Sequence, residues 1–378
     1  MLNTAQDVII PKLPGIFRTI FLYTGQGEST LMVIPTGPQT SDYQFILVDS
    51  DWDKEPGEVD LVALFKDLFV DGGQIDVFIN THPHDDHVGG IRGIYDEIGI
   101  TEVWHSNHKP AGKHQDAYAE LRYVLGKVGK ANEYHLKGTD DINKIRRTDD
   151  TEVIKPLGLI DYVVLSPSEY LCDDIAEEEG DARNRRIHEQ CGVIKFSYGR
   201  NPKHILITGD SDKTAWQDHI TTYHFNKLPT NILSASHHGS YTFFKDSRED
   251  EEVYDAHLKQ MQPAYLIVSA PKQTDSPHKH PDDEAMAIYR QHIDEEGIFH
   301  LGDYKGGQKI CVIVDITDDG TMDIQVDKRL VEAYGTDDTD KNPPKEESLR
   351  DRMASVAYVG SHGTRIDRQP MGSGYVVV

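Results

Sequence analysis

Apolar runs and turns alternate along about the first 330 residues of this 378-residue chain, with longer amphipathic stretches between them. The run IDVFIN at 75–80 is typical of a strand that is covered on both faces. Apolar residues at helical spacing predict helices at 59–73, 114–129, 212–224 and 282–293. Further strands are predicted at 17–24, 29–35, 44–50, 101–106, 157–167, 191–199, 204–210, 230–236, 264–270, 309–316 and 321–327. Strands interleaved with helices indicate an α/β protein that is built in layers.

The same pattern divides the chain into two parts. Residues 1–330 carry the apolar runs, and we expect them to form one domain. Residues 331–378 are polar and contain prolines but few apolar side chains, so we expect a disordered or partner-binding tail. Within the domain, the charged segment 173–186 is predicted to be a loop between two strands.

The segment THPHDDHVGG at 81–90 gathers three histidines and two aspartates within six positions, directly after a predicted buried strand. On an extended loop the side chains at i and i+2 point the same way, so His82 and His84 can converge on one metal ion. Asp86 and His87 point elsewhere and can reach a second ion. A solvated, charged turn is the alternative. A full HxHxDH after a buried strand is more specific than such a turn, and we predict metal binding.

Further metal ligands are available at the ends of later predicted strands. Asp210 follows one strand in a Gly-Asp turn, where a carboxylate can bridge two ions about 3.5–4 Å apart. His237 and His238 follow the next strand, and His188 comes shortly before another. Each of these alone could be an ordinary polar residue, but their shared position at strand ends favours a two-metal site. Asp85 fills the variable position of HxHxDH and is expected to face solvent.

The composition narrows the class of function. The formal net charge is −25, and so acidic a surface repels phosphate backbones unless bound cations or a local basic groove intervene. This excludes a broad electrostatic nucleic-acid binder. Three cysteines without CxxC spacing are expected to be reduced thiols. The N-terminal residues lack a signal-peptide pattern, and no segment approaches the roughly 20 apolar residues of a membrane span. We therefore expect a soluble, cytoplasmic protein.

The order of these motifs resembles that of the metallo-β-lactamase superfamily, in which HxHxDH is followed by His, Asp and His at strand ends. More closely, the chain is similar to the soluble metallo-hydrolase domain of the ComEC competence proteins. This similarity covers about residues 17–327 and rests on GQGES at 25–29, ILVDS at 46–50, THPHDDHVGG at 81–90, ILITGD at 205–210, SHHGS at 236–240 and SPHKHPDDEA at 276–285. It implies a four-layer αββα sandwich with the metals in a cleft at one edge.

The resemblance also implies a complete set of metal ligands. One metal would be held by three histidines, His82, His84 and His188. The other would be held by Asp86, His87 and one of His237 or His238, with Asp210 between the two metals. We expect His237 to be the ligand because it follows the strand directly, which leaves His238 behind the metal or facing the substrate.

Three residues are expected to assist catalysis by analogy with the family. Asp49 matches the first-strand aspartate, which usually orients a ligand histidine. Asp86 and His280 are expected to take part in proton handling. Two positions depart from the ComEC-like pattern, because that group often has Asn where His188 stands and usually has Asp where Glu28 stands. The first departure makes the ligand set more complete, and the second is a mild change.

Nitrogen and oxygen ligands suit two divalent metal ions, Zn²⁺ or Mn²⁺, which would lower the pKa of a bridging water. We therefore predict a dinuclear metal-dependent phosphodiesterase, acting on DNA or RNA as a nuclease. The net charge counts against long polyanions, so the alternative is a hydrolase of a small phosphodiester or another small ester. A third possibility is a non-enzymatic component of a defence or toxin-like system, which would bind a protein partner through the C-terminal tail.

Overall fold

The computed structural model describes residues 4–37, 42–52, 56–110 and 114–336. Within these ranges ten strands form one sheet, in the spatial order β16 (Met322–Asp327), β15 (Cys311–Ile316), β1 (Phe17–Phe21), β2 (Thr30–Pro35), β3 (Tyr43–Val48), β4 (Ile75–Asn80), β5 (Ile100–His105), β6 (Glu133–His135), β7 (Lys144–Arg147) and β8 (Glu152–Ile154). Six strands form a second sheet, in the order β14 (Ile298–His300), β13 (Tyr265–Val268), β12 (Ile232–Ser234), β11 (Lys203–Ile207), β10 (Val193–Tyr198) and β9 (Asp161–Ser166).

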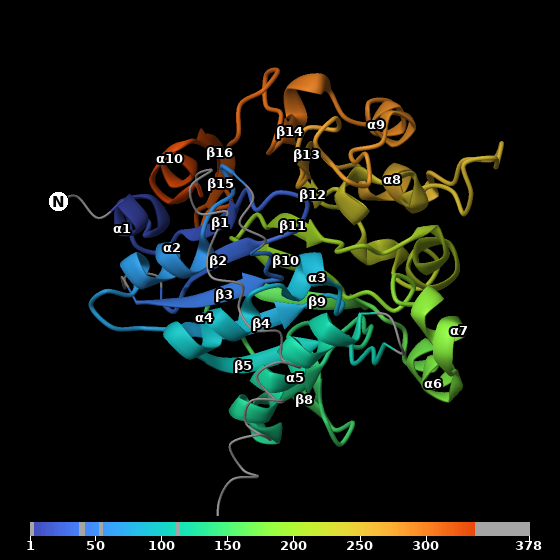
Figure 1. Ribbon diagram of the computed structural model, residues 1–378, viewed down its shortest axis with the longest axis horizontal. Helices are drawn as coiled ribbons and strands as arrows, with labels where there is room; N and C mark the ends of the chain where they lie inside the picture. Colours follow the sequence, from blue (N-terminus) through green and yellow to red (C-terminus); the bar gives the residue numbers. More distant parts are fainter. Residues whose placement is uncertain (1–3, 38–41, 53–55, 111–113, 337–378) are drawn as a thin grey trace, which may run out of the picture. The chain divides into compact units, whose positions relative to one another are not determined.

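The helical segments connect these strands (Figure 1). The α-helices are α1 (Thr4–Ile9), α2 (Leu61–Leu68), α3 (Asp85–Val88), α4 (Ile91–Glu97), α5 (Gln115–Val128), α6 (Glu169–Glu177), α7 (Gly180–Arg185), α8 (Ala256–Met261), α9 (Asp283–Tyr289) and α10 (Arg329–Tyr334). Shorter or tighter turns of helix are η1 (Lys130–Asn132), η2 (Ala215–Ile220), η3 (Phe225–Lys227), η4 (Ser236–Gly239), η5 (Tyr241–Phe243) and η6 (Glu295–Gly297). The four helices predicted from apolar periodicity each coincide with one of these segments.

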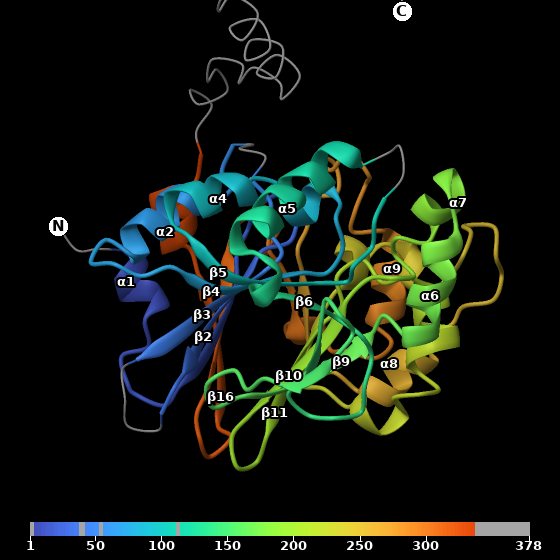
Figure 2. The ribbon, with the colours of Figure 1, turned by 90° about the horizontal axis from the view of Figure 1, so that it is seen from below.

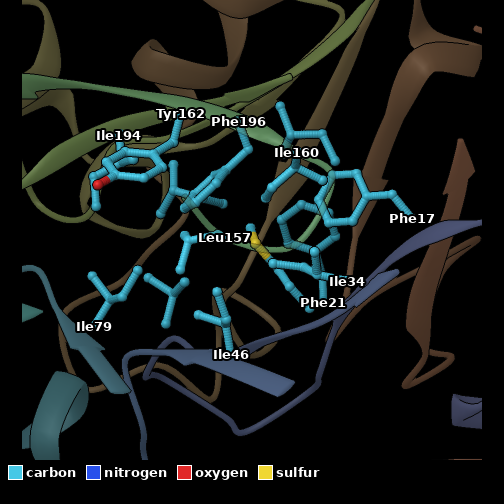
Figure 3. Packing of buried hydrophobic residues seen from close by; sticks show 14 of the residues in the cluster. Phe17, Phe21, Ile34, Ile46, Ile79, Leu157, Ile160, Tyr162, Ile194 and Phe196 are labelled. Carbon is cyan, nitrogen blue, oxygen red and sulfur yellow. The ribbon is translucent and has the colours of Figure 1, made fainter. Parts of the chain in front are cut away.

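The two sheets pack face to face around a central hydrophobic core. Ile34 and Ile46 from the first sheet and Ile194 and Phe196 from the second are fully buried in it, and Figure 3 shows these side chains meeting between the sheets. Each fully buried side chain of this size contributes about 1.5–3 kcal/mol to stability. This core therefore fixes how the two sheets lie against each other.

Helices cover the outer face of each sheet. Strand β2 shows why, because Met32 and Ile34 lie in the central core while Leu31 and Val33 lie in a second core under helices. Successive side chains of a strand point to opposite faces, and in β2 both faces are apolar. Residues of α1, α2, α4, α5 and α10 complete that second core, and residues of η2, α8 and α9 form a third on the other sheet. Figure 2 shows α2, α4 and α5 lying along one side of the first sheet. The expected αββα sandwich is confirmed.

Parallel strands bring the candidate ligands together. Strands β3, β4 and β5 run parallel in the first sheet, and β11, β12 and β13 run parallel in the second. The loops that leave the carboxyl ends of such strands gather at one edge, where open α/β sheets commonly bind ligands. Asp49 follows β3, the HxHxDH segment follows β4, Asp210 follows β11 and the two adjacent histidines follow β12.

The prediction of a charged loop at 173–186 is wrong, because α6 and α7 occupy most of it. In α6 the only buried residues are Leu171 and Ile175, an i, i+4 pair that is too short a signal to outweigh the surrounding charges. The folded domain continues past its predicted end at residue 330. Helix α10 extends beyond that residue, and the Thr336 amide donates to the Glu58 carbonyl at 2.9 Å. The tail predicted from 331 lies outside the described residues from 337 onward. No described helix has the length and apolar character needed to cross a membrane.

Candidate metal centre

Three histidines and one aspartate form a first group of metal-ligand atoms, here called the three-histidine subsite: His82, His84, His188 and Asp210. The Nδ1 atom of His84 lies 3.0 Å from Nε2 of His82 and 3.3 Å from Nε2 of His188. His84 has an extended backbone just before α3, which sends the i and i+2 imidazoles to the same place. Burial, and then the neighbouring His188, lower the pKa of His84 to about 2, so its ring is neutral and available as a ligand.

The same aspartate belongs to a second group, here called the Asp86 subsite: Asp86, His87, His238 and Asp210. Nε2 of His87 lies 3.0 Å from Oδ1 of Asp210 and 3.3 Å from Nε2 of His238. Nε2 of His238 lies 3.4 Å from Oδ2 of Asp86. Burial raises the pKa of Asp86. The neighbouring His87 and His238 lower this pKa by more than burial raises it, so the net shift is downward. The carboxylate is therefore ionised and can bind a cation.

Asp210 joins the two subsites through its two oxygens. Oδ1 faces His87 and His238, at 3.0 and 3.5 Å, whereas Oδ2 lies 3.5 Å from His82 and 3.7 Å from His188. The side chain is only 1 % exposed, and the described groups on both sides of it are histidine nitrogens at 3.0–3.7 Å. A buried carboxylate is costly unless its charge is paired, and a cation on each side would balance it. The donor set thus fits two metal ions.

Asp49 lies beneath this centre and accepts several hydrogen bonds. Its Oδ2 is 2.8 Å from Nδ1 of His87, which turns the Nε2 atom of that ring toward Asp210. Its Oδ1 accepts from the Thr81 amide at 2.7 Å and from Nδ2 of Asn80 at 3.2 Å. Orienting contacts of this kind fix the tautomer of a ligand histidine.

The structure places His238, not His237, with Asp86 and His87. His238 is 2 % exposed, and its Nδ1 donates to the Ser269 carbonyl at 2.8 Å. His237 is directed toward Thr242, with Nδ1 2.9 Å from Oγ1, and its Nε2 approaches Asp210 Oδ2 to 3.5 Å. The expected preference for His237 rested on its being the first residue after the strand, and the geometry favours its neighbour instead.

A cleft of about 680 Å³ opens over the centre. Its lining consists of Gln26, Asp51, Trp52, His84, Asp85, Asp86, Gly89, His114, His188, Asp210, His237, His238, Pro277, His278 and His280. Asp85 is exposed, as expected, and is one of these lining residues. His280 lies with its ring 5.3 Å from that of His237, and burial lowers its pKa to about 4.

The sequence alone did not indicate two aromatic rings of this cleft. The His114 ring centroid lies 4.0 Å from that of His84. His114 immediately precedes α5, and its position at the start of a predicted helix was the only available signal. A Cβ atom added at Gly90 or Gly93 would lie 2.6 or 3.1 Å from the Trp52 side chain, so these two glycines make room for it.

A third group of metal-ligand residues lies at the edge of β5 and β6 and has another explanation: His105, Glu133 and His135. The Nδ1 atom of His105 accepts a hydrogen bond from the Asn107 amide at 3.1 Å, so the proton of the neutral ring is on Nε2. That nitrogen lies 3.4 Å from Oε1 of Glu133 and donates to it. A protonated nitrogen cannot bind a metal, and the group is accounted for as a hydrogen-bonded pair with a second histidine beside it.

The four-layer fold and the two ligand groups that share a carboxylate define a protein of the metal-dependent hydrolase type. The chain belongs to the metallo-β-lactamase superfamily, whose family model matches residues 15–258. This is a superfamily of metal-dependent hydrolases that use divalent ions, and the clustered histidines and aspartates are the candidate ligands. A search of the curated proteins found no match.

Several solved structures match the chain at low identity. One is Igni18, described as a novel metallo hydrolase from the archaeon Ignicoccus hospitalis, at 11 % identity over 82 % of this chain and 98 % of that one, with a TM-score of 0.39. Another is the metallo-β-lactamase SMB-1, at 13 % identity over 89 % and 96 %, with a TM-score of 0.29. A third is a mutant metallo-β-lactamase from Cronobacter sakazakii, at 14 % identity over 59 % and 77 %, with a TM-score of 0.30.

Proposed function

We propose that this chain is a dinuclear metal-dependent phosphodiesterase that holds Zn²⁺ or Mn²⁺ in its two subsites. The observation that carries the proposal is the shared Asp210, which directs one oxygen toward each group of ligands. The ligand atoms are imidazole nitrogens and carboxylate oxygens, which suit these two metals. The order of motifs resembles that of the ComEC metallo-hydrolase domain, and this resemblance supports phosphodiester cleavage.

Two divalent cations at such a centre activate a water molecule and bind the oxygens of a phosphoryl group. The side chains of the chain then have separate tasks. Asp210 and Asp86 would balance the positive charge of the two cations and hold them in their subsites. His280 is among the residues that line the cleft. Since this ring is neutral at pH 7, we propose that it forms a hydrogen bond with the leaving-group oxygen of the substrate.

The lining of the cleft favours a compact phosphodiester over a long polyanion. No lysine or arginine is among the described residues that line it, and four aspartates are: Asp51, Asp85, Asp86 and Asp210. Contacts of lysine and arginine with many phosphates provide most of the affinity for nucleic-acid backbones. The overall charge of −25 adds to this effect. A nuclease acting on DNA or RNA is the second candidate, and it rests on the similarity to the ComEC domain.

Two measurements test the proposal in sequence. Metal analysis of the purified protein should find about two equivalents of transition metal per chain. The protein should then hydrolyse bis-(p-nitrophenyl) phosphate with added Mn²⁺ or Zn²⁺, and single- and double-stranded DNA and RNA should be tested in parallel. Trace metal alone would refute the metal centre, whereas two metals without turnover of any phosphodiester would refute the reaction.

A pair of variants separates the centre from the surface. Asp210→Asn removes the shared charge and should abolish the hydrolysis. Asp246→Asn changes a surface carboxylate that is 58 % exposed and pairs with Lys213, and it should leave the rate unchanged. Equal rates in the two variants would show that the activity does not depend on this centre.

A further inference from the structure

Thr81 is the residue between strand β4 and the first ligand histidine, and its side chain is fully buried. Its hydroxyl makes polar contacts with Asp49, His82 and Cys191. Oγ1 lies 2.6 Å from Oδ2 of Asp49 and 3.2 Å from Nδ1 of His82. The hydroxyl is thus placed between the orienting carboxylate and a histidine of the three-histidine subsite.

The direction of the proton in each contact follows from the partners. The Thr81 hydroxyl donates its single proton to Oδ2 of Asp49, at 2.6 Å. The hydroxyl oxygen is then left to accept from His82, whose proton must be on Nδ1. Cys191 Sγ lies 3.7 Å from the same nitrogen and is the weaker partner because sulfur forms weak hydrogen bonds.

This arrangement leaves the Nε2 atom of His82 unprotonated, and Nε2 is the atom that faces the subsite. It lies 3.0 Å from Nδ1 of His84 and 3.5 Å from Oδ2 of Asp210. The ring therefore presents a lone pair to the position where a metal would be bound. The contact with Thr81 both selects the tautomer and sets the ring orientation.

We propose that Thr81 is a positioning residue that extends the orienting effect of Asp49 to His82. Asp49 orients His87 of the Asp86 subsite directly, at 2.8 Å. Through the Thr81 hydroxyl it also orients His82 of the three-histidine subsite. One buried carboxylate thereby orients one histidine ring in each subsite. This inference rests on the proposed dinuclear centre.

The surroundings of Thr81 hold the hydroxyl in place. Its carbonyl accepts from the Gly192 amide at 2.8 Å, and its own amide donates to Asp49 at 2.7 Å. A Cβ atom added at Gly209 would lie 2.6 Å from Oγ1 and 2.7 Å from Cβ of Thr81. The side chain is therefore confined from several directions, and a variant of the same shape is needed to test the hydroxyl alone.

The matched variants are Thr81→Val, which keeps the shape and removes the hydroxyl, and Thr81→Ser, which keeps the hydroxyl. The probe is cadmium, because ¹¹³Cd bound in the two subsites should give two separate NMR resonances. His188→Ala would identify the resonance of the three-histidine subsite. In Thr81→Val we expect cadmium affinity at that subsite to fall about 10- to 100-fold, with the Asp86 subsite unchanged. In Thr81→Ser both affinities should stay close to those of the wild type.

Two results would overturn the inference: Thr81→Val binding both ions as the wild type does, or losing both to the same degree. A wild-type protein that binds no cadmium would instead refute the proposed metal centre. The tautomer can also be read without any variant of Thr81. In metal-free wild-type protein with ¹⁵N-labelled histidine, the His82 signal, assigned with His82→Asn, should show the proton on Nδ1. A proton on Nε2 would overturn the inference even if Thr81→Val did not fold.

Discussion

Gly209 turns the chain between β11 and the shared candidate ligand Asp210, and its replacement by alanine tests how closely this turn must approach the HxHxDH loop. Its φ is +47°, which is in the left-handed region that side chains disfavour. A Cβ atom there would lie 2.6 Å from Oγ1 of Thr81 and 2.7 Å from Sγ of Cys191. Both neighbours are fully buried and cannot move aside without shifting the candidate metal ligands.

The expected loss of stability has two parts. The left-handed conformation costs an alanine roughly 1–2 kcal/mol. Overpacking in a dense interior costs about 1–3 kcal/mol more, so Gly209→Ala should lower the free energy of unfolding by about 2–5 kcal/mol. Gly306 is the matched control, because its φ is +79° and nothing lies within 4 Å of its added Cβ. Gly306→Ala should lose only the first part, about 1–2 kcal/mol.

Urea unfolding of both metal-free variants measures these losses, and metal analysis after dialysis measures the effect on the centre. Gly209→Ala displaces Asp210, so we expect its metal affinity to fall about tenfold or more, as for other losses of ligand orientation. Gly306→Ala should retain the metal content of the wild type. Equal stability and equal metal content in the two variants would show that the close contact at Gly209 is unimportant.

Further predictions concern the histidines. After dialysis against a chelator of moderate strength, His188→Ala should retain about one metal equivalent per chain, and His238→Ala should retain less metal than that. The reason is that His238 is fixed by the Ser269 carbonyl, whereas His188 is 21 % exposed. Metal analysis that gives the reverse order would refute this prediction. Burial lowers the pKa of His238, but Asp210 and Asp86 raise it, and the resulting pKa is about 9. Metal binding at pH 7 should therefore release protons. Calorimetry that gives the same heat of metal binding in buffers of different ionisation enthalpy would contradict this proton release. Burial lowers the pKa of His257 to about 3, so below pH 6.5 the unfolded chain binds a proton that the folded chain does not. From pH 7 to pH 4.5 the wild type should therefore lose about 2–3 kcal/mol of stability relative to His257→Leu. Urea titrations of both proteins at the two pH values measure this loss. If the free energies of unfolding of the two proteins differ by the same amount at both pH values, the pKa shift of His257 is refuted.

The fold could be predicted where the chain is apolar on both faces. Strands β2 and β4 are buried over nearly their whole length, and such runs stand out against the turns that flank them. Strands β7 (Lys144–Arg147) and β8 (Glu152–Ile154) were not predicted, because their side chains are mostly polar and partly exposed. They form an edge hairpin whose pairing depends on backbone hydrogen bonds and on cross-strand ion pairs such as that of Arg146 with Glu152, at 3.1 Å.

The residues of the candidate site were indicated by their positions along the chain, because the carboxyl ends of parallel strands meet at one edge. This argument applies to the segment after β4 and to Asp210 after β11. It cannot predict the position of His114, because this residue immediately precedes α5 and contacts His84 only through the tertiary fold. It also cannot assign proton positions, which depend on contacts such as that of Thr81 with Asp49.

The pair His237 and His238 shows where an argument from position stops. The strand was predicted to end at residue 236, so His237, the next residue, was expected at the centre, whereas β12 ends at Ser234. The chain instead takes three successive left-handed residues, with φ of +50° at His237, +56° at His238 and +81° at Gly239. Left-handed conformations cost a non-glycine residue roughly 1–2 kcal/mol each, so no local preference predicts such a turn. It persists because the surroundings hold it, through the bond of the His237 amide to the Gly209 carbonyl and that of His238 to Ser269. The strained turn that places His238 at the centre therefore depends on the same glycine that places Asp210 there.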